Sequence, residues 1–201
     1  TEKMVELVEK AGPAMVTGGK LLTLKEWMAT LPPEIATSKP SLLSLQGAIL
    51  MSTGEVNQSI ILLSEVIDRL SGDDSDIEIL SLSLIRRSVA FRMLGDYQNS
   101  LSDNRKALEI FEDQPSLGKI KAEALRILGV TYYLQGEFKE ALSVLKQSLR
   151  MFESYDDQQN IPKLLFNIGL MHKVLGDYVL AEMMYQEALD YWRSGGNLAW
   201  A

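Results

Sequence analysis

Residues 125–141 read LRILGVTYYLQGEFKEA, and the pattern in this stretch recurs four times along the chain. Its signature is a glycine followed by an acidic residue and, in three copies, by an aromatic residue. Successive glycines are 41, 41 and 40 residues apart, and a fixed period of this size predicts a stacked array of repeated units. The four copies are Gly54-Glu55-Val56, Gly95-Asp96-Tyr97, Gly136-Glu137-Phe138 and Gly176-Asp177-Tyr178.

The triplet predicts a turn between two helices. Glycine adopts the left-handed conformation that ends a helix. The acidic side chain can then accept a free backbone N–H of the next helix, or interact favourably with the helix dipole. The aromatic residue packs the turn, and a small residue seven positions before each glycine (Gly47, Ser88, Gly129, Gly169) lets the two helices approach closely. First helices are expected at residues 40–53, 77–94, 118–135 and 161–175, and second helices at 56–71, 97–113, 138–155 and 178–194.

The first 40 residues predict a degenerate copy of this unit. Residues 1–31 read as a helical pair with a turn at Gly18-Gly19, in which Pro13 interrupts the first helix or ends it early. Residues 32–40 read as a connection. No strand pattern is present, so we expect an all-α fold, a right-handed superhelix of stacked antiparallel helix pairs. Its predicted segments are residues 1–39, 40–76, 77–117, 118–160, 161–196 and 197–201, the last being the start of a truncated repeat.

The last two full copies resemble the tetratricopeptide repeat most strongly. That repeat has a usual period of about 34 residues, so about six residues per unit are extra, and they fit a longer second helix and link. HEAT-type arrays also have periods of about 40 residues, but they lack the paired glycine and aromatic positions. The matching residues are Leu125, Leu128, Gly129, Tyr132, Gly136, Phe138, Ala141, Leu145 and Leu149, then Leu165, Ile168, Gly169, His172, Gly176, Tyr178, Ala181, Tyr185, Ala188 and Leu189.

The N-terminal third is similar to one particular group of repeat proteins. The stretch LLTLKEWMATLP, residues 21–32, continues through Glu34, Pro40 and Leu42 to the first repeat glycines. This arrangement resembles the start of the repeat domain in MalT-type, LuxR-family ATP-dependent transcriptional regulators. The resemblance implies a domain that senses an effector or a protein partner and relays it to flanking ATPase and DNA-binding modules. The alternative is a tetratricopeptide scaffold that recruits a protein partner outside transcription.

Composition excludes several classes of function for this segment. The chain has a net charge of -7 and a pI of about 4.9, which argues against binding a phosphate backbone. It contains no cysteine and no phosphate-binding loop, and no run of about 18 apolar residues that could span a membrane. We therefore expect a cytoplasmic protein segment without direct nucleic acid contact. Because the sequence opens at Thr1 and stops in what reads as a new helix, we expect a larger protein around it.

The candidate binding surface is a stripe on the first helix of each unit, the helix that lines the concave face of such arrays. Residues at i, i+4 and i+7 share this stripe, which contains both apolar side chains and positively charged ones. It can hold a peptide or protein partner, or a small anionic or sugar-like effector. The alternative is that these are ordinary packing or solvated residues. Self-association is a further prediction. The candidate residues are Met51, Arg92, Arg126, Tyr133, Phe166 and Lys173.

No catalytic or metal site is expected. The single histidine, His172, stands where other units have aromatic residues, so it is expected in the core with one hydrogen bond. It cannot complete a metal site alone, nor a convincing serine–histidine–aspartate set. The acidic run Asp73, Asp74, Asp76 and Glu78 lacks the spacing of a calcium loop. Arg86-Arg87 is too short a basic patch to attract nucleic acid. We therefore expect neither an enzyme nor a cofactor.

Overall fold

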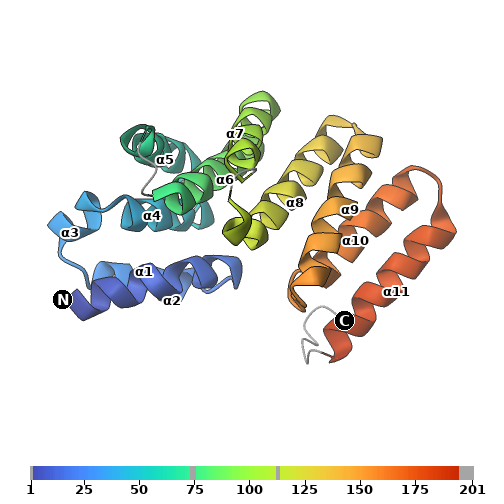
Figure 1. Cartoon of the computed structure of the whole chain (residues 1–201), viewed down its shortest axis with the longest axis horizontal. Coiled ribbons are helices and arrows are strands. Elements are labelled where there is room, and N and C mark those ends of the chain that lie inside the picture. Colours follow the sequence, from blue (N-terminus) through green and yellow to red (C-terminus); the bar gives the residue numbers. More distant parts are fainter. Residues whose placement is uncertain (1, 73–75, 112–113, 195–201) are drawn as a thin grey trace. The chain divides into compact units, whose positions relative to one another are not determined.

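The computed structural model describes residues 2–72, 76–111 and 114–194. These residues are helical and contain no strand, as predicted (Figure 1). The chain forms two compact units, unit 1 (Thr1–Ala107) and unit 2 (Leu108–Ala201), and each is described here by itself. In chain order the helices are α1 (Glu2–Thr17), α2 (Leu21–Ala29), α3 (Pro33–Ser38), α4 (Pro40–Ser52), α5 (Val56–Leu70), α6 (Ile77–Met93), α7 (Tyr97–Ile110), α8 (Gly118–Gln135), α9 (Phe138–Ser154), α10 (Ile161–Val174) and α11 (Tyr178–Ser194).

The repeated glycine ends its helix as predicted. Gly136 has φ of +84°, and its N–H donates to the carbonyl of Tyr133 at 3.0 Å. The N–H of Glu137 donates to the carbonyl of Tyr132 at 2.9 Å, which completes a Schellman turn. The carbonyl of Glu137 then accepts the first hydrogen bond of α9, from the N–H of Ala141 at 2.9 Å. The other three glycines of the triplets also have positive φ, so the turn has the same backbone in each copy.

The acidic residue of the triplet acts through its side chain in only some copies. Asp96 accepts a hydrogen bond from the backbone N–H of Asn99 at 3.2 Å, which is the predicted cap. The side chains of Glu55 and Glu137 make no capping hydrogen bond. For these two residues the side chain makes no cap, which leaves the other predicted alternative, a favourable interaction of the carboxylate with the helix dipole.

Small residues bring paired helices together, as predicted. A Cβ atom added at Gly129 in α8 would lie 2.6 Å from Leu145 Cγ in α9. A Cβ atom at Gly47 in α4 would lie 2.7 Å from Leu63 Cγ in α5. Real Cβ atoms do not come this close, so the leucine occupies the space that glycine leaves. In these two pairs, α4 with α5 and α8 with α9, the helices therefore pack backbone against side chain.

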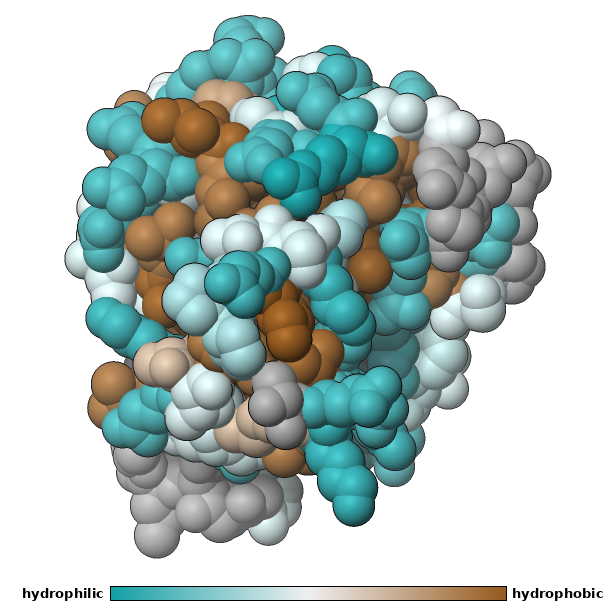
Figure 2. Space-filling view, turned by 90° about the vertical axis from the view of Figure 1, so that its left-hand side faces the viewer, coloured by the Kyte–Doolittle hydropathy of each residue, from teal (hydrophilic) through white to brown (hydrophobic). Residues whose placement is uncertain are grey.

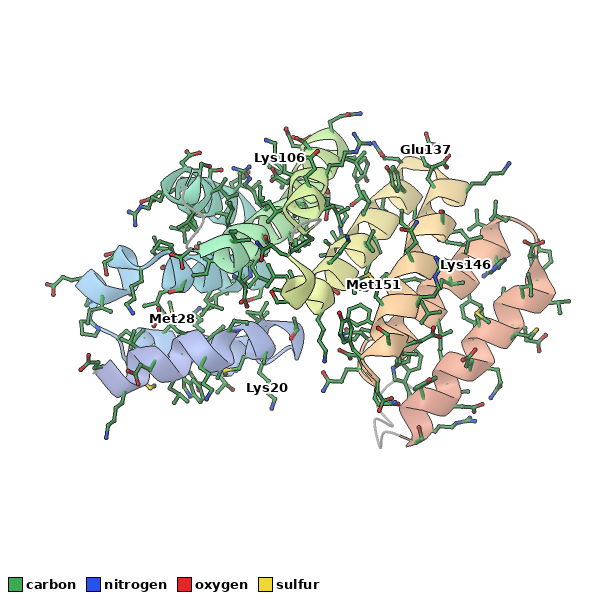
Figure 3. The ribbon with its side chains drawn as sticks, in the orientation of Figure 1. Lys20, Met28, Lys106, Glu137, Lys146 and Met151 are labelled. Carbon is green, nitrogen blue, oxygen red and sulfur yellow. The ribbon has the colours of Figure 1, made fainter. Side chains whose placement is uncertain are left out.

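Each unit has its own apolar core. In unit 1, Val8, Leu24 and Leu42 are fully buried, and Met28 packs against their cluster. In unit 2, Leu145 and Phe152 are part of a buried cluster formed by α8, α9, α10 and α11. Figure 3 places Met28 in unit 1 and Met151, which packs against the unit 2 cluster, in unit 2. Figure 2 shows one face on which hydrophobic patches are separated by hydrophilic side chains.

Two predictions for the N-terminal segment are wrong. Pro13 lies inside α1, which continues to Thr17. A proline in a helix interior costs about 3 kcal/mol, but Gly12 and Met15 on either side of it are buried in the unit 1 core. That burial offsets the lost hydrogen bond. Residues 32–40 are also not a plain connection, because Pro33 starts the short helix α3. Pro40 starts α4, as the predicted helix over residues 40–53 required.

Candidate functional site

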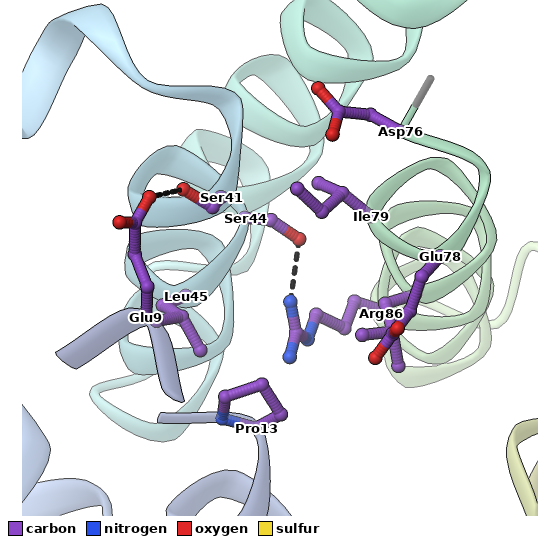
Figure 4. Close-up of a pocket in the computed structure, with 10 residues that line it drawn as sticks. Glu9, Pro13, Ser41, Ser44, Leu45, Asp76, Glu78, Ile79 and Arg86 are labelled. Atoms are coloured by element: carbon purple, nitrogen blue, oxygen red, sulfur yellow. Dashed lines mark hydrogen bonds between the residues drawn. The ribbon is translucent and has the colours of Figure 1, made fainter. Parts of the chain in front are cut away.

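A cavity of about 330 Å³ lies inside unit 1, between α1, α4 and the start of α6 (Figure 4). Its walls are partly apolar, and its polar groups are one arginine, two serines and three carboxylates. This volume is at the lower end of the range for small-molecule sites in proteins. The lining residues are Glu9, Pro13, Ser41, Ser44, Leu45, Asp76, Glu78, Ile79, Leu82 and Arg86.

Arg86 is the buried cation of this cavity. Its side chain is 7% exposed and reaches from α6 toward Ser44 on α4 (Figure 4). Its Nη1 donates to Ser44 Oγ at 2.5 Å, and that hydroxyl also shares a hydrogen bond with Ser83 Oγ at 2.7 Å. Within the described ranges, no carboxylate forms an ion pair with Arg86. Burial lowers the pKa of Arg86 to about 10, so it still carries its charge at neutral pH.

Carboxylates lie around this cation. Glu9 on α1 accepts hydrogen bonds from Ser41 Oγ at 2.6 Å and from Lys39 Nζ at 2.9 Å. Burial raises the pKa of Glu9, but these two donors lower it by more, so the net shift is downward and Glu9 is an anion at neutral pH. Asp76 precedes α6 and Glu78 lies in its first turn. The cavity therefore combines a buried guanidinium with three acidic groups.

The neighbouring arginine on α6 is satisfied within the protein. Arg87 binds Asp103 through two hydrogen bonds of 2.7 and 2.8 Å, and it also donates to Ser64 at 2.8 Å. Its guanidinium carbon lies 5.8 Å from the centre of the Phe91 ring. Asp103 is 3% exposed, so this is a buried ion pair with good geometry. Arg87 and Arg86 are adjacent in sequence, yet only Arg86 reaches a cavity.

The predicted stripe residues fall in both units. Met51 on α4 and Arg92 on α6 are half-buried in unit 1. In unit 2, Arg126 on α8 binds Glu123 through two hydrogen bonds of 2.8 and 2.6 Å. Burial lowers the pKa of Arg126, and the hydrogen bond and charge of Glu123 raise it by more. The guanidinium of Arg126 is thus already paired inside the protein.

Two of the other three stripe residues of unit 2 lie next to Tyr185 on α11. The ring of Phe166, which is 46% exposed, lies 5.4 Å from the ring of Tyr185. Lys173 and Tyr185 both line a shallow hollow of about 330 Å³. We call Phe166, Lys173 and Tyr185 the Tyr185 surface. The third stripe residue, Tyr133, has its ring 5.9 Å from that of Phe138. Burial and then the electrostatic effect of Tyr133 raise the pKa of Tyr185.

Sequence reasoning missed Arg86 as a site residue, although the repeat register contains a signal. Arg86 stands nine residues before its glycine, where the first and third copies have Leu45 and Ile127. Both of those residues are buried. A charged residue at a register position that is apolar and buried in two other copies indicates a buried charge, although the fourth copy has the polar Asn167 there. Tyr185 was noted only as a repeat position, because its contacts depend on the packing of α10 against α11.

His172 is in the position predicted for it. It is 6% exposed, and its Nδ1 lies 3.3 Å from Asp177 Oδ2, a single hydrogen bond in the core. Across the part of the chain that the structure describes, no three histidine or acidic side chains gather where a metal ion could bind. In those same residues, no helix combines the length and hydrophobicity needed to cross a membrane.

Comparison with known proteins agrees with the repeat pattern. A family model described as tetratricopeptide repeat matches residues 78–154. This part of the chain carries tetratricopeptide repeats. Over 97 residues, or 48% of the chain, the sequence is 29% identical to Regulatory protein RapG of Bacillus subtilis (strain 168). The match covers 27% of RapG, so the chain spans about a quarter of the length of this relative.

Solved structures share the fold. A Rap protein complexed with Competence and Sporulation Factor has a TM-score of 0.73 and 18% identity, over 94% of this chain and 51% of that one. The Rap conjugation gene regulator of plasmid pLS20, in complex with the Phr* peptide, has a TM-score of 0.65 and 17% identity, over 75% of this chain and 42% of that one. These likenesses support the tetratricopeptide fold, and the resemblance to MalT-type regulators stays a prediction.

Proposed function

We propose that this segment is a non-catalytic regulatory module that binds a peptide or protein partner. The observation that carries the proposal is the Tyr185 surface, where the exposed ring of Phe166, the ring of Tyr185 and the side chain of Lys173 come together in unit 2. Aromatic side chains bury large apolar areas in a complex, and a lysine selects for an acidic group. The names of two similar proteins, a regulatory protein and a regulator in complex with a peptide, support a partner of this kind.

The finer form of the proposal places the module in a bacterial transcriptional regulator of the cytoplasm. There the partner, or a small-molecule effector, would favour one arrangement of the repeats, and that population shift would reach flanking ATPase and DNA-binding modules. Self-association would be a second consequence of the same surface. The competing form is a scaffold outside transcription. The coding sequence on either side distinguishes the two, since the regulator requires a phosphate-binding loop upstream and a helix-turn-helix downstream.

The partner surface is tested by thermal unfolding of the segment in the presence of a pool of short peptides and, separately, of sugar and organic-acid inducers. We expect a peptide to raise the melting temperature and Phe166→Ala to remove that rise. The control is Leu134→Ala, which truncates a side chain of unit 2 that is similarly exposed, at 42%. Binding that survives Phe166→Ala places the partner elsewhere. A shift with an inducer but with no peptide favours the effector over the partner.

A further inference from the structure

We propose that the cavity of unit 1 binds a zwitterionic ligand, whose carboxylate is held by Arg86 and whose ammonium group faces Glu9, Asp76 and Glu78. The ligand class is a free amino acid or short peptide with an apolar side chain, in which the ammonium and carboxylate groups lie close together. This site lies within unit 1, so it is distinct from the Tyr185 surface and does not rest on that proposal.

The first step of the argument is the unbalanced charge of Arg86. Its guanidinium is buried, and its hydrogen bond to the uncharged Ser44 hydroxyl provides no counter-ion. Burying a charge without an opposite charge is costly, so such groups are normally paired or held for a ligand. Arg87 next to it shows the paired arrangement, with both Asp103 oxygens bound. Arg86 instead presents its planar fork to a cavity, and that fork matches the two oxygens of a carboxylate.

The second step is the acidic rim. Three carboxylates line the same cavity, and Figure 4 shows Glu9, Asp76 and Glu78 arranged around the space that Arg86 enters. These acids disfavour a ligand with several negative charges, such as a phosphate or a nucleotide, because like charges repel. They favour a ligand in which a positive group lies close to its single carboxylate. Glu9 already binds Lys39, which leaves Asp76 and Glu78 as the main partners for an ammonium group.

The third step is the size and polarity of the walls. Pro13, Leu45, Ile79 and Leu82 provide apolar surface between the cation and the acids. A volume of about 330 Å³ suits a molecule of the size of one or two amino acids. An apolar side chain of the ligand would contact these walls, while its two charged ends would bind the groups described above. The cavity thus matches a small amphipathic zwitterion.

The test uses calorimetric titration of the whole segment with matched probes. These are L-leucine, Leu-Leu, Leu-Leu amide, N-acetyl-Leu-Leu, inorganic phosphate, and a longer peptide that ends in Leu-Leu. We expect a zwitterion to bind, and loss of either charged end to weaken it about tenfold or more, as expected for a lost charged contact. Binding of leucine or Leu-Leu that exceeds binding of the longer peptide supports the zwitterion, whereas equal binding of the longer peptide shows that the acids recognise no ammonium group and overturns the proposal. Phosphate binding as tightly as the zwitterion, or binding by none of the probes, overturns the proposal.

Variants separate a binding role from a packing role. Arg86→Met should abolish binding while melting at or above the wild-type temperature, because it removes an unbalanced buried charge. Arg86→Lys keeps the charge but loses the fork, so binding should fall about tenfold or more. The control Arg150→Met changes an exposed arginine of unit 2 and should bind as wild type does. Unchanged binding in both Arg86 variants overturns the proposal, and Phe166→Ala should leave this binding intact.

Discussion

Units 1 and 2 are built from the same helical pair, but their interiors differ in polarity. The buried polar residues of unit 1 among the described residues are Ser44, Ser59, Ser81, Ser83, Arg86, Ser88, Ser100, Asp103 and Asn104. Those of unit 2 are Thr131, Ser148 and His172. The difference shows that the triplet determines the turn that joins two helices. The residues buried where the two helices pack can be either apolar or polar with hydrogen bonds.

One contact, compared between copies, explains how this difference arises. In the first and third copies a glycine faces a leucine, Gly47 with Leu63 and Gly129 with Leu145. At the same register the second copy has Ser88 and Asn104, and Asn104 Nδ2 donates to Ser88 Oγ at 2.9 Å. A buried hydrogen bond thus replaces an apolar contact. The amide nitrogen of Asn104 and the Ser88 hydroxyl thus bind each other, whereas Asn104 Oδ1 is buried without a hydrogen-bond partner among the described residues.

The largest expected effect comes from breaking the buried ion pair of unit 1. Asp103→Ala removes both acceptors of Arg87 and leaves its charge buried, so we expect a loss of about 3–5 kcal/mol in unfolding free energy. Urea unfolding measures the loss, and hydrogen exchange should show it in peptides from residues 76–107. The double variant Arg87→Met with Asp103→Leu should recover most of it. A loss below about 1 kcal/mol would mean that unit 1 does not depend on this pair.

The second effect tests whether the apolar core of unit 2 behaves like its counterpart in unit 1. Leu145→Ala should cost about 2–5 kcal/mol, because it opens a space opposite Gly129 that the helices cannot close completely. Leu63→Ala is the matched change in unit 1, since Leu63 fills the equivalent space opposite Gly47. Hydrogen exchange should assign each loss to its own unit. If either variant changed the hydrogen-exchange rates of both units equally, that result would contradict the view that each unit has a separate core.

The smallest effect concerns the ion pair of unit 2. Glu123→Gln removes the charge opposite Arg126, but both side chains are about one-quarter exposed, at 26% and 25%. Solvent screens this pair, so we expect a change below about 1 kcal/mol. The measurement is urea unfolding of Glu123→Gln and of Asp103→Ala under the same conditions, so that the two losses in unfolding free energy can be compared directly. A loss as large as that of Asp103→Ala would show that the partly exposed pair is as important as the buried one.

The helix boundaries follow from local sequence. The predicted ranges of seven repeat helices agree with the observed ones to within one residue, because each end depends on a glycine turn or on a polar segment beside it. The eighth, predicted at residues 97–113, starts at Tyr97 as predicted, and its predicted end lies outside the described residues. The continuation of α1 past Pro13 was not predictable in this way. It depends on burial of Gly12 against Leu45, whose position is set by a different helix.

The site residues show a similar limit. Helical spacing predicts Phe166 and Lys173 as stripe residues, but they come together only through Tyr185, which belongs to α11. The binding role of all six stripe residues stays a prediction. For Arg126, helical spacing could not reveal that its guanidinium already binds the carboxylate of Glu123.

The period, the turns and the all-α class follow from the sequence alone, since each rests on residues within one helical pair. Which of the two adjacent arginines is paired, and which lines the cavity, depends on the packing of helices that are distant in sequence. Arg87 meets Asp103 on α7, whereas Arg86 enters a space bounded by α1 and α4. Whether a buried charge has a partner depends on residues that are distant in sequence. The spacing of the glycines contains no information about those residues.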